Sequence, residues 1–217
     1  MNLVLIGPPG AGKGTQADRV ALAWGVPKVS TGDILRRAAA SEDLLGIAVS
    51  GAMGAGELIA DDLMTTLVDE RLSQPDALKG FVLDGFPRSV EQAQILDMLL
   101  EGRGPLVVVE IAVPEPELLR RLGHRRICDR CGVNQESSGP DAPACACGGS
   151  FVLRSDDNET TARRRLTVYS RTTRPVLDFY KGRGALQTVN GDLPPDEVAE
   201  RISLAIDPVF DQYFSEK

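Results

Sequence analysis

The chain has 217 residues, 42% of them hydrophobic, and a formal net charge of −7. This length and composition allow one main domain with a substantial core, and the acidic balance argues against a general nucleic-acid-binding protein. No apolar stretch approaches the ~20 residues that span a bilayer, and no basic leader precedes the first apolar run, so we expect a soluble cytoplasmic protein.

Strands and helices are predicted to alternate along the chain. Short strand-like runs are found at residues 3–6, 81–83, 107–111 and 186–189. The spacing of apolar residues predicts helices at residues 15–24, 33–40, 61–72, 90–100, 116–122, 159–180 and 196–206. This alternation is typical of an α/β fold with a parallel sheet, in which ligands bind beyond the carboxyl ends of the strands.

The first predicted strand leads directly into a glycine-rich turn at residues 7–15, with the sequence GPPGAGKGT. The turn follows the G-x-x-x-x-G-K-[ST] pattern, except that Gly14 stands where a hydroxyl residue is expected and Thr15 comes next. Its backbone N–H groups, the charge of Lys13 and the N-terminus of the following helix can together hold phosphate oxygens. The turn therefore predicts a nucleotide-binding P-loop.

Two other segments carry recognisable local patterns, one suited to phosphate chemistry and one to the start of a helix. Residues 84–88 (DGFPR) follow the predicted strand 81–83, so Asp84 can orient magnesium-bound water and Arg88 can bind a phosphate with its planar donors. A turn acid and an exposed ion pair are the structural alternatives for these two residues. Residues 30–33 (STGD) are typical of a helix start, where a hydroxyl caps free N–H groups.

The four cysteines all fall between residues 128 and 147, where glycine, proline and serine replace the helical periodicity. Cys128 and Cys131 form a C-x-x-C half-site for zinc, whereas Cys145 and Cys147 are spaced C-x-C. We interpret this stretch as a small inserted module with a structural metal site rather than as a disulfide framework. A site of three cysteines completed by Asp141 or His124, and a module without metal, remain alternatives.

The motifs at residues 7–15, 30–33 and 84–88, followed by Arg154-x-Asp156-Asp157, resemble those of adenylate kinases in the same order along nearly the whole chain. The cysteine module is similar to that of the long-lid, zinc-type members, but its second half-site is C-x-C where those members have C-x-x-C or C-x-x-D, so that Ala144 stands in the place of their third ligand. The resemblance implies reversible transfer of a phosphoryl group, ATP + AMP to 2 ADP, with Mg²⁺. It also implies a P-loop fold of three layers, in which helices cover both faces of a parallel sheet, with a small AMP-binding helical segment and a zinc-ribbon-like lid.

The resemblance implies roles for individual residues. The ATP-binding residues would be Gly10, Ala11, Gly12, Lys13, Gly14, Thr15, Arg121, Arg125 and Leu193. The AMP-binding residues would be Thr31, Arg36, Glu57, Leu58, Ile59, Gly85, Arg88, Gln92, Arg154 and Arg165. The residues acting on the transferred group would be Lys13, Arg88, Arg125, Arg154 and Arg165, with Asp84 contacting Mg²⁺ through water. The zinc ligands would be Cys128, Cys131, Cys145 and Cys147.

Two of these side chains allow a chemical expectation. The carboxamide of Gln92 offers both a donor and an acceptor to the edge of adenine. Arg121 and Arg125 are four residues apart, so we expect them on one helix face with a nucleotide between their like charges.

The resemblance also predicts the division of the chain into parts. The core domain would comprise residues 1–29, 60–121 and 161–217, the AMP-binding segment residues 30–59, and the lid residues 122–160. The two smaller parts are expected to move, because a site open to water would hydrolyse ATP.

Three other functions are compatible with parts of the sequence. One is a kinase of another nucleoside monophosphate, such as UMP or CMP, and a second is a relative that uses GTP. The third is a nucleotide sensor or zinc-ribbon interaction module that binds without turnover. The acidic surface and self-contained fold favour a monomer in each case.

Overall fold

The computed structural model describes residues 1–40, 44–55, 57–136, 144–153 and 158–215. The predicted site residue Arg154, with Asp156, Asp157 and Asp141, lies outside these ranges. The strands are β1 (Asn2–Ile6), β2 (Lys28–Ser30), β3 (Phe81–Asp84), β4 (Leu106–Ala112), β5 (Arg125–Cys128), β6 (Asn134–Glu136), β7 (Phe151–Leu153) and β8 (Leu186–Asn190). The α-helices are α1 (Lys13–Trp24), α2 (Thr31–Ala39), α3 (Leu44–Ala55), α4 (Asp61–Leu72), α5 (Val90–Leu99), α6 (Glu115–His124), α7 (Glu159–Val168), α8 (Arg174–Lys181) and α9 (Pro195–Ser215).

The main sheet is parallel and has five strands in the order β2-β3-β1-β4-β8. Leu5 of β1 pairs with Asp84 of β3, and Ile6 pairs with Glu110 of β4. The carboxyl ends of the central strands therefore meet at one edge, which places the P-loop after β1 beside the residues that follow β3. The predicted parallel α/β fold is confirmed.

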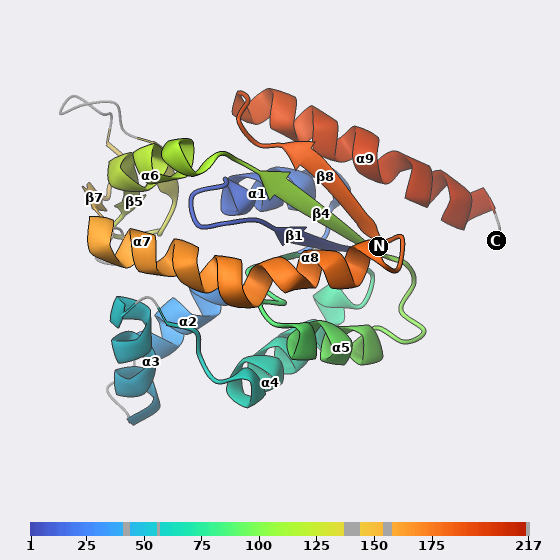
Figure 1. Cartoon of the computed structure of the whole chain (residues 1–217), viewed down its shortest axis with the longest axis horizontal. Coiled ribbons are helices and arrows are strands. Elements are labelled where there is room, and N and C mark those ends of the chain that lie inside the picture. Colours follow the sequence, from blue (N-terminus) through green and yellow to red (C-terminus); the bar gives the residue numbers. More distant parts are fainter. Residues whose placement is uncertain (41–43, 56, 137–143, 154–157, 216–217) are drawn as a thin grey trace.

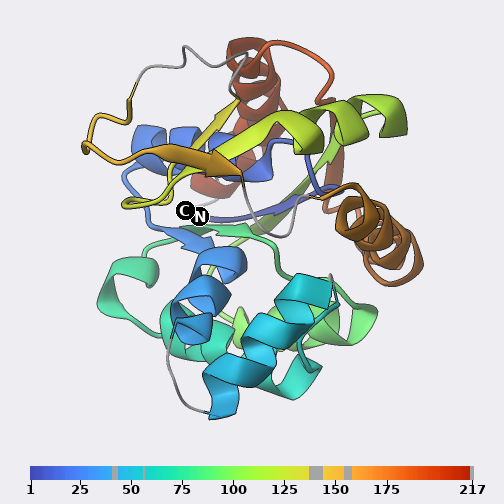
Figure 2. The ribbon, with the colours of Figure 1, turned by 90° about the vertical axis from the view of Figure 1, so that its left-hand side faces the viewer.

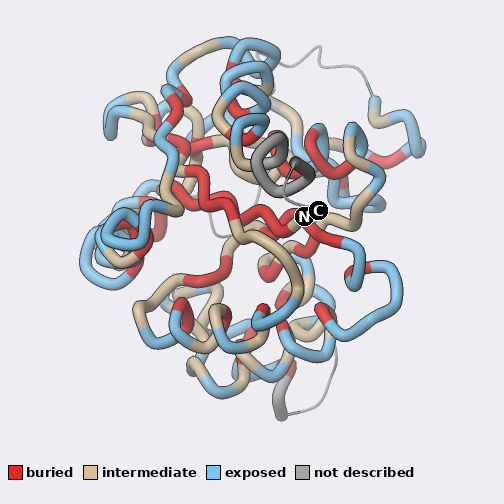
Figure 3. The backbone as a smooth tube through the Cα atoms, turned by 90° about the vertical axis from the view of Figure 1, so that its right-hand side faces the viewer, coloured by how far each residue is buried: buried red, intermediate tan, exposed pale blue. Residues whose placement is uncertain are grey.

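Helices cover both faces of this sheet (Figure 1). Val4 and Ile6 pack against a core that includes residues of α2, α4, α5 and α8, whereas Leu3 and Leu5 pack against α1 and α9. Figure 3 shows the strands as a buried layer between the helices. Because both faces are covered, the first strand reads as a continuous apolar run instead of an alternating one.

The structure contains elements that the sequence patterns did not predict. Strand β2 has three residues and one fully buried side chain, Val29, which is too short for a recognisable alternation. Helix α3 consists largely of small residues. The predicted helix at 159–180 is helical throughout, but a π-helical turn at Tyr169–Thr173 separates α7 from α8. This turn lies just before Pro175, which cannot donate a backbone hydrogen bond.

The cysteine module forms a second, antiparallel sheet in the order β6-β5-β7. Figure 2 shows its strands beside α6 and apart from the main sheet. Within the described residues, no helix is both long and apolar enough to cross a membrane.

Candidate active site

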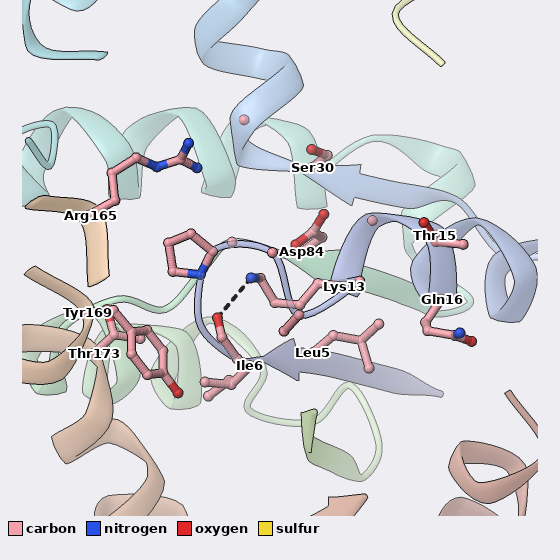
Figure 4. A pocket seen from close by; sticks show the side chains of 18 of the residues that line it. Leu5, Ile6, Lys13, Thr15, Gln16, Ser30, Asp84, Arg165, Tyr169 and Thr173 are labelled. Carbon is pink, nitrogen blue, oxygen red and sulfur yellow. Dashed lines mark hydrogen bonds between the residues drawn. The ribbon is translucent and has the colours of Figure 1, made fainter. Parts of the chain in front are cut away.

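The P-loop connects the buried strand β1 to α1 and curls around the side chain of Lys13. Gly10 and Gly12 have φ angles of 87° and 89°, a region that favours glycine, and Gly12 is the N-cap of α1. The Lys13 Nζ donates hydrogen bonds to the carbonyl oxygens of Gly7 at 2.8 Å and Pro8 at 3.0 Å. Figure 4 shows Lys13 close to Asp84, with Arg165 extending toward them from α7.

A cavity of about 610 Å³ opens at this edge of the sheet. It joins the P-loop to the start of α2, the turn after β3, the end of α6 and helix α7. Among the predicted site residues, those that line it are Gly10, Ala11, Gly12, Lys13, Gly14, Thr15, Arg36, Glu57, Leu58, Ile59, Asp84, Gly85, Arg88, Gln92, Arg121, Arg125, Arg165 and Leu193. Thr31 does not line the cavity: it is buried, and its hydroxyl donates to the carbonyl oxygen of Asp84 at 3.3 Å.

Positive charges converge around Lys13. Burial lowers the pKa of Lys13 to about 8, Asp84 opposes this shift, and Arg88, Arg165 and Arg125 lower the pKa further. The three arginines come from separate elements of the chain but all act on one ammonium group. Such a cluster is stabilised when a polyanion enters the cavity.

The lowered pKa of Lys13 predicts a pH-dependent affinity for ATP, the phosphoryl donor that the sequence resemblance implies. Bound phosphates favour the charged form, so above pH 8 the free protein must take up a proton when it binds. We therefore expect the Kd for ATP to rise with pH above about 8, by up to about tenfold per pH unit. Calorimetry at pH 8.5 in buffers of different ionisation enthalpy measures this proton uptake.

Lys13→Arg is the control for this titration, because arginine keeps its charge throughout this range. Its Kd for ATP should be weaker but flat with pH. A wild-type Kd that does not change between pH 7.5 and 9 would contradict the expectation.

The turn after β3 holds Arg88 against the floor of the cavity. Its Nε donates to the Gly85 carbonyl oxygen at 2.7 Å, and its backbone N–H donates to Gln92 Oε1 at 2.7 Å. Burial lowers the pKa of Arg88, while Asp84 raises it. Gly85 has a φ of 90°, and a Cβ there would press on Thr31 Oγ1, so only glycine fits.

The part of the cavity near Gln92 is mainly apolar. Its lining includes Leu35, Met53, Ile59 and Met64, together with the half-exposed Arg36, which forms an ion pair with Asp33. The predicted cap at the start of α2 is confirmed, since Ser30 Oγ accepts from the Asp33 N–H. An apolar slot with one carboxamide and two arginines suits a flat base attached to a phosphate.

Arg121 and Arg125 line the cavity but do not share a helix face, so that prediction is wrong. Helix α6 ends at His124, and Arg125 takes an extended conformation and begins β5. Arg121 stays within the helix, where its Nε donates to Glu117 Oε1 at 2.7 Å and its Nη1 donates to the Gly191 carbonyl oxygen at 3.0 Å. Because β5 begins at Arg125, this residue does not continue the helical spacing that starts from Arg121.

Gln16 and Tyr169 are among the residues that line the cavity without belonging to any of the sequence motifs. Gln16 follows the P-loop, and its Nε2 donates to the Pro195 carbonyl oxygen at 2.9 Å. Tyr169 comes from the π-helical turn. Their positions at the cavity depend on contacts between distant parts of the chain, since Gln16 bonds to a residue 179 positions away and Tyr169 lies far from the P-loop in sequence.

The four cysteine sulfurs lie within 4.8 Å of one another. Cys128 and Cys147 are 3.4 Å apart, Cys131 and Cys145 are 3.4 Å apart, and Cys145 and Cys147 are 3.5 Å apart, all measured between Sγ atoms. Tetrahedral zinc with Zn–S bonds of about 2.3 Å requires S···S distances of about 3.8 Å. The donor set and its spacing therefore fit a zinc ion.

Local turns bring the C-x-C pair into this cluster. The Gly148 N–H donates to the Cys145 carbonyl oxygen at 2.8 Å, and Gly148 has a φ of 78°. A Cβ at Gly149 would collide with the Cys128 sulfur. His124 is not part of the cluster, since its Nδ1 is 2.7 Å from the Arg120 carbonyl oxygen at the end of α6.

Backbone groups tune one of these thiols toward the form that binds metals. The backbone N–H of Cys131, followed by that of Arg130, lowers the pKa of Cys128 to about 6, whereas the neighbouring thiols raise the pKa of Cys145 and Cys147. Thiolate is the form that coordinates zinc.

Comparison with known proteins identifies the family. The sequence model of the family described as adenylate kinase matches residues 5–185. The chain belongs to the adenylate kinase family. An adenylate kinase from Archaeoglobus fulgidus is 42% identical over 96% of this chain and 99% of its own length. Adenylate kinases from Thermodesulfovibrio yellowstonii (45% identical, 93% of this chain and 97% of the relative) and Streptomyces avermitilis (41%, 93% and 94%) are also similar.

Membership of the adenylate kinase family agrees with the shape of the site. Enzymes of this family are phosphotransferases that use a nucleoside monophosphate as acceptor and need room for two nucleotides. The cavity of this chain is lined both by the P-loop with Lys13 and by Arg88, Gln92 and the apolar side chains of α2 and α4.

Proposed function

We propose that this chain catalyses the reversible transfer of a phosphoryl group between ATP and AMP, giving 2 ADP, and so balances the adenine nucleotides of the cell. The observation that carries the proposal is a cavity that joins a P-loop to a second slot across a cluster of cationic side chains. A protein that only sensed a nucleotide would need affinity but not four positive groups at the junction of two slots.

The donor ATP would lie on the P-loop side. The backbone N–H groups of residues 10–15 and the ammonium of Lys13 would hold its phosphates. Arg121 and Leu193 would lie beside the adenine, and Arg125 near the phosphates. Two internal bonds of Arg121, to Glu117 and Gly191, support this placement because they fix its guanidinium at the wall of the cavity.

The acceptor AMP would lie in the slot between α2, α4 and α5. Arg36 and Arg88 would hold its phosphate, and Gln92 would bind the edge of the adenine. The lining by residues 57–59 and Gly85 supports contacts along the nucleoside. Thr31 would act indirectly, by holding the carbonyl oxygen of Asp84.

Phosphoryl transfer requires little covalent or acid–base catalysis by the protein, because the acceptor phosphate is already anionic. Lys13, Arg88, Arg125, Arg165 and Arg154 would position the two nucleotides and offset the charge on the transferred group. Asp84 and Thr15 supply oxygen atoms at the cavity wall, which suits Mg²⁺. When bound with ATP, Mg²⁺ neutralises charge on the phosphates.

The cysteine cluster would hold a structural zinc ion. Four sulfur ligands leave no open position for chemistry, and the cluster lies in the lid and not in the cavity lining. We propose the division already predicted, with residues 30–59 and 122–160 as the AMP-binding segment and the lid, and the remainder as the core. We also propose a cytoplasmic monomer that does not bind nucleic acid, consistent with the net charge of −7.

A coupled assay of ADP formation tests the proposed function. With Mg·ATP as donor and AMP, CMP, UMP or GMP as acceptor, we expect turnover with AMP to exceed the others by more than tenfold in kcat/KM. Faster turnover with CMP or UMP would assign the chain to another nucleotide. Nucleotide binding without ADP formation would favour a sensor.

A further inference from the structure

Asp61, the first residue of α4, connects that helix to the start of α5. Its Oδ1 accepts a hydrogen bond from Gln92 Nε2 at 2.6 Å, and its Oδ2 accepts one from Ser89 Oγ at 2.9 Å. Ser89 Oγ also accepts from the Gln92 N–H at 3.1 Å as the cap of α5. The hydroxyl proton of Ser89 is thus directed at Asp61.

These contacts fix which way the Gln92 carboxamide points. Its Oε1 accepts from the Arg88 N–H at 2.7 Å, while its Nε2 donates to Asp61. Rotating the amide by half a turn would place the NH₂ group of Gln92 against the Arg88 N–H and its oxygen against the Asp61 carboxylate. Both hydrogen bonds would then be lost. Gln92 is 2% exposed, so water cannot readily compensate for the lost bonds.

The fixed amide keeps hydrogen-bonding capacity for a ligand. A carboxamide has two donor hydrogens and two acceptor lone pairs, and the bonds to Asp61 and Arg88 use one of each. Gln92 lines the cavity, whereas Asp61 is not among its lining residues. Among the residues that the structure describes, Asp61 is thus connected to the cavity through Gln92.

The direction of the amide decides which purine it can bind. Adenine has an amino group at position 6, which donates, and a ring nitrogen N1, which accepts. Hypoxanthine and guanine have the opposite pattern, with an accepting oxygen at position 6 and a donating N1–H. An amide free to rotate can match either pattern, but an amide held in one direction matches only one.

We propose that Asp61 is a positioning residue that fixes the direction of the Gln92 carboxamide and thereby makes the acceptor site select adenine over 6-oxopurines. This inference rests on the proposed function, because it assumes that Gln92 faces the acceptor base. The Arg88 N–H supplies half of the restraint and cannot be removed by changing a side chain. Asp61 supplies the other half.

The experiment compares AMP with IMP as acceptors. IMP differs from AMP only at position 6 and N1, so the ratio of the two kcat/KM values measures the direction of the amide without the additional 2-amino group of GMP. In Asp61→Ala we expect the AMP:IMP ratio to fall by about tenfold, the effect of one buried hydrogen bond. Asp61→Asn keeps an acceptor oxygen and should restore part of the ratio.

Ser89→Ala is the matched control. It removes the second bond to Asp61 and the cap of α5, but leaves the bond between Asp61 and Gln92. We expect a lower Tm and an AMP:IMP ratio within about twofold of the wild type. Because Asp61→Asn preserves size and polarity, it gives the answer even if Asp61→Ala does not fold.

The outcomes separate this inference from the proposed function. If the wild type uses AMP but neither Asp61 variant changes the ratio, or if Ser89→Ala changes it equally, Asp61 merely joins α4 to α5 and the inference is overturned. If the wild type does not phosphorylate AMP, the proposed function fails and this inference fails with it.

Discussion

Arg88→Ala is expected to lower kcat for ADP formation by about 10²–10⁴-fold, by analogy with the loss of an arginine finger or an oxyanion donor. The fold holds Arg88 in place at the wall of the cavity. Its Nε is bonded to the Gly85 carbonyl oxygen, and its own carbonyl oxygen accepts from Thr173 Oγ1 at 3.0 Å. The bond from Nε does not use the two terminal nitrogens, which can bind two phosphate oxygens at once.

The guanidinium of Arg88 is already buried in the free protein, and this burial lowers its pKa. The unfavourable free energy of burying the charge therefore belongs to folding and not to the reaction. A guanidinium held in advance needs little reorganisation when charge shifts during transfer. The loss should therefore appear in kcat and kcat/KM together, not in KM alone.

Two variants provide controls for this measurement. Arg88→Lys keeps the charge but loses the planar pair of donors, so its kcat should fall between those of the wild type and the alanine variant. Arg163→Ala removes an exposed arginine of α7 that pairs with Glu159 of the same helix, and its activity should stay within about twofold of the wild type. A rise in KM for AMP at constant kcat would mean that Arg88 only binds the acceptor.

Much of the fold was predictable because the parallel sheet is covered on both faces. Its strands at residues 3–6 and 81–83 are uninterrupted apolar runs, and the strand at 107–111 is apolar except for Glu110. All three runs end in turns, and the structure extends each by only one or two residues. Strand β2 was not predictable, since it forms where Lys28–Ser30 meets Val82–Asp84 at the edge of the sheet. That pairing depends on tertiary contact and not on a local pattern.

The site was predictable where a motif follows a strand. The P-loop and Asp84 must meet, because parallel strands carry both to one edge. Sequence reasoning failed at Arg125, where a change from helix to lid strand turns the chain. It also missed Gln16 and the link from Asp61 to Gln92, whose partners are 179 and 31 residues away.

Removal of zinc is expected to unfold the lid while leaving the core folded. The lid sheet has no apolar core of its own among the described residues: Val133, Val152 and Leu153 are 55%, 43% and 57% exposed. The two hydrophobic clusters that hold the main sheet contain no residue of β5, β6 or β7. In small metal modules of this kind, the free energy of metal binding supplies most of the free energy of folding.

Hydrogen exchange with and without a chelator measures this effect. We expect the amides of β5 and β7 to lose their protection by about 10²-fold or more when zinc is removed, while those of β1 and α1 keep theirs. Activity should fall in parallel, because Arg125 begins β5 and also lines the cavity.

The C-x-C half-site gives this prediction its sharpest test. Cys145→Ser should lower zinc affinity by about 10²-fold or more. Ala146→Ser is the control, because it adds the same hydroxyl at the exposed position between the two ligands. This control variant should still bind one zinc ion per chain. Metal analysis of the purified variants gives the stoichiometry, and hydrogen exchange gives the state of the lid. The prediction is contradicted if Cys145→Ser binds zinc with unchanged affinity and the lid amides keep their protection. Three cysteines would then suffice to bind zinc, and the short distance between the Cys131 and Cys145 sulfurs would not reflect shared coordination of a metal ion.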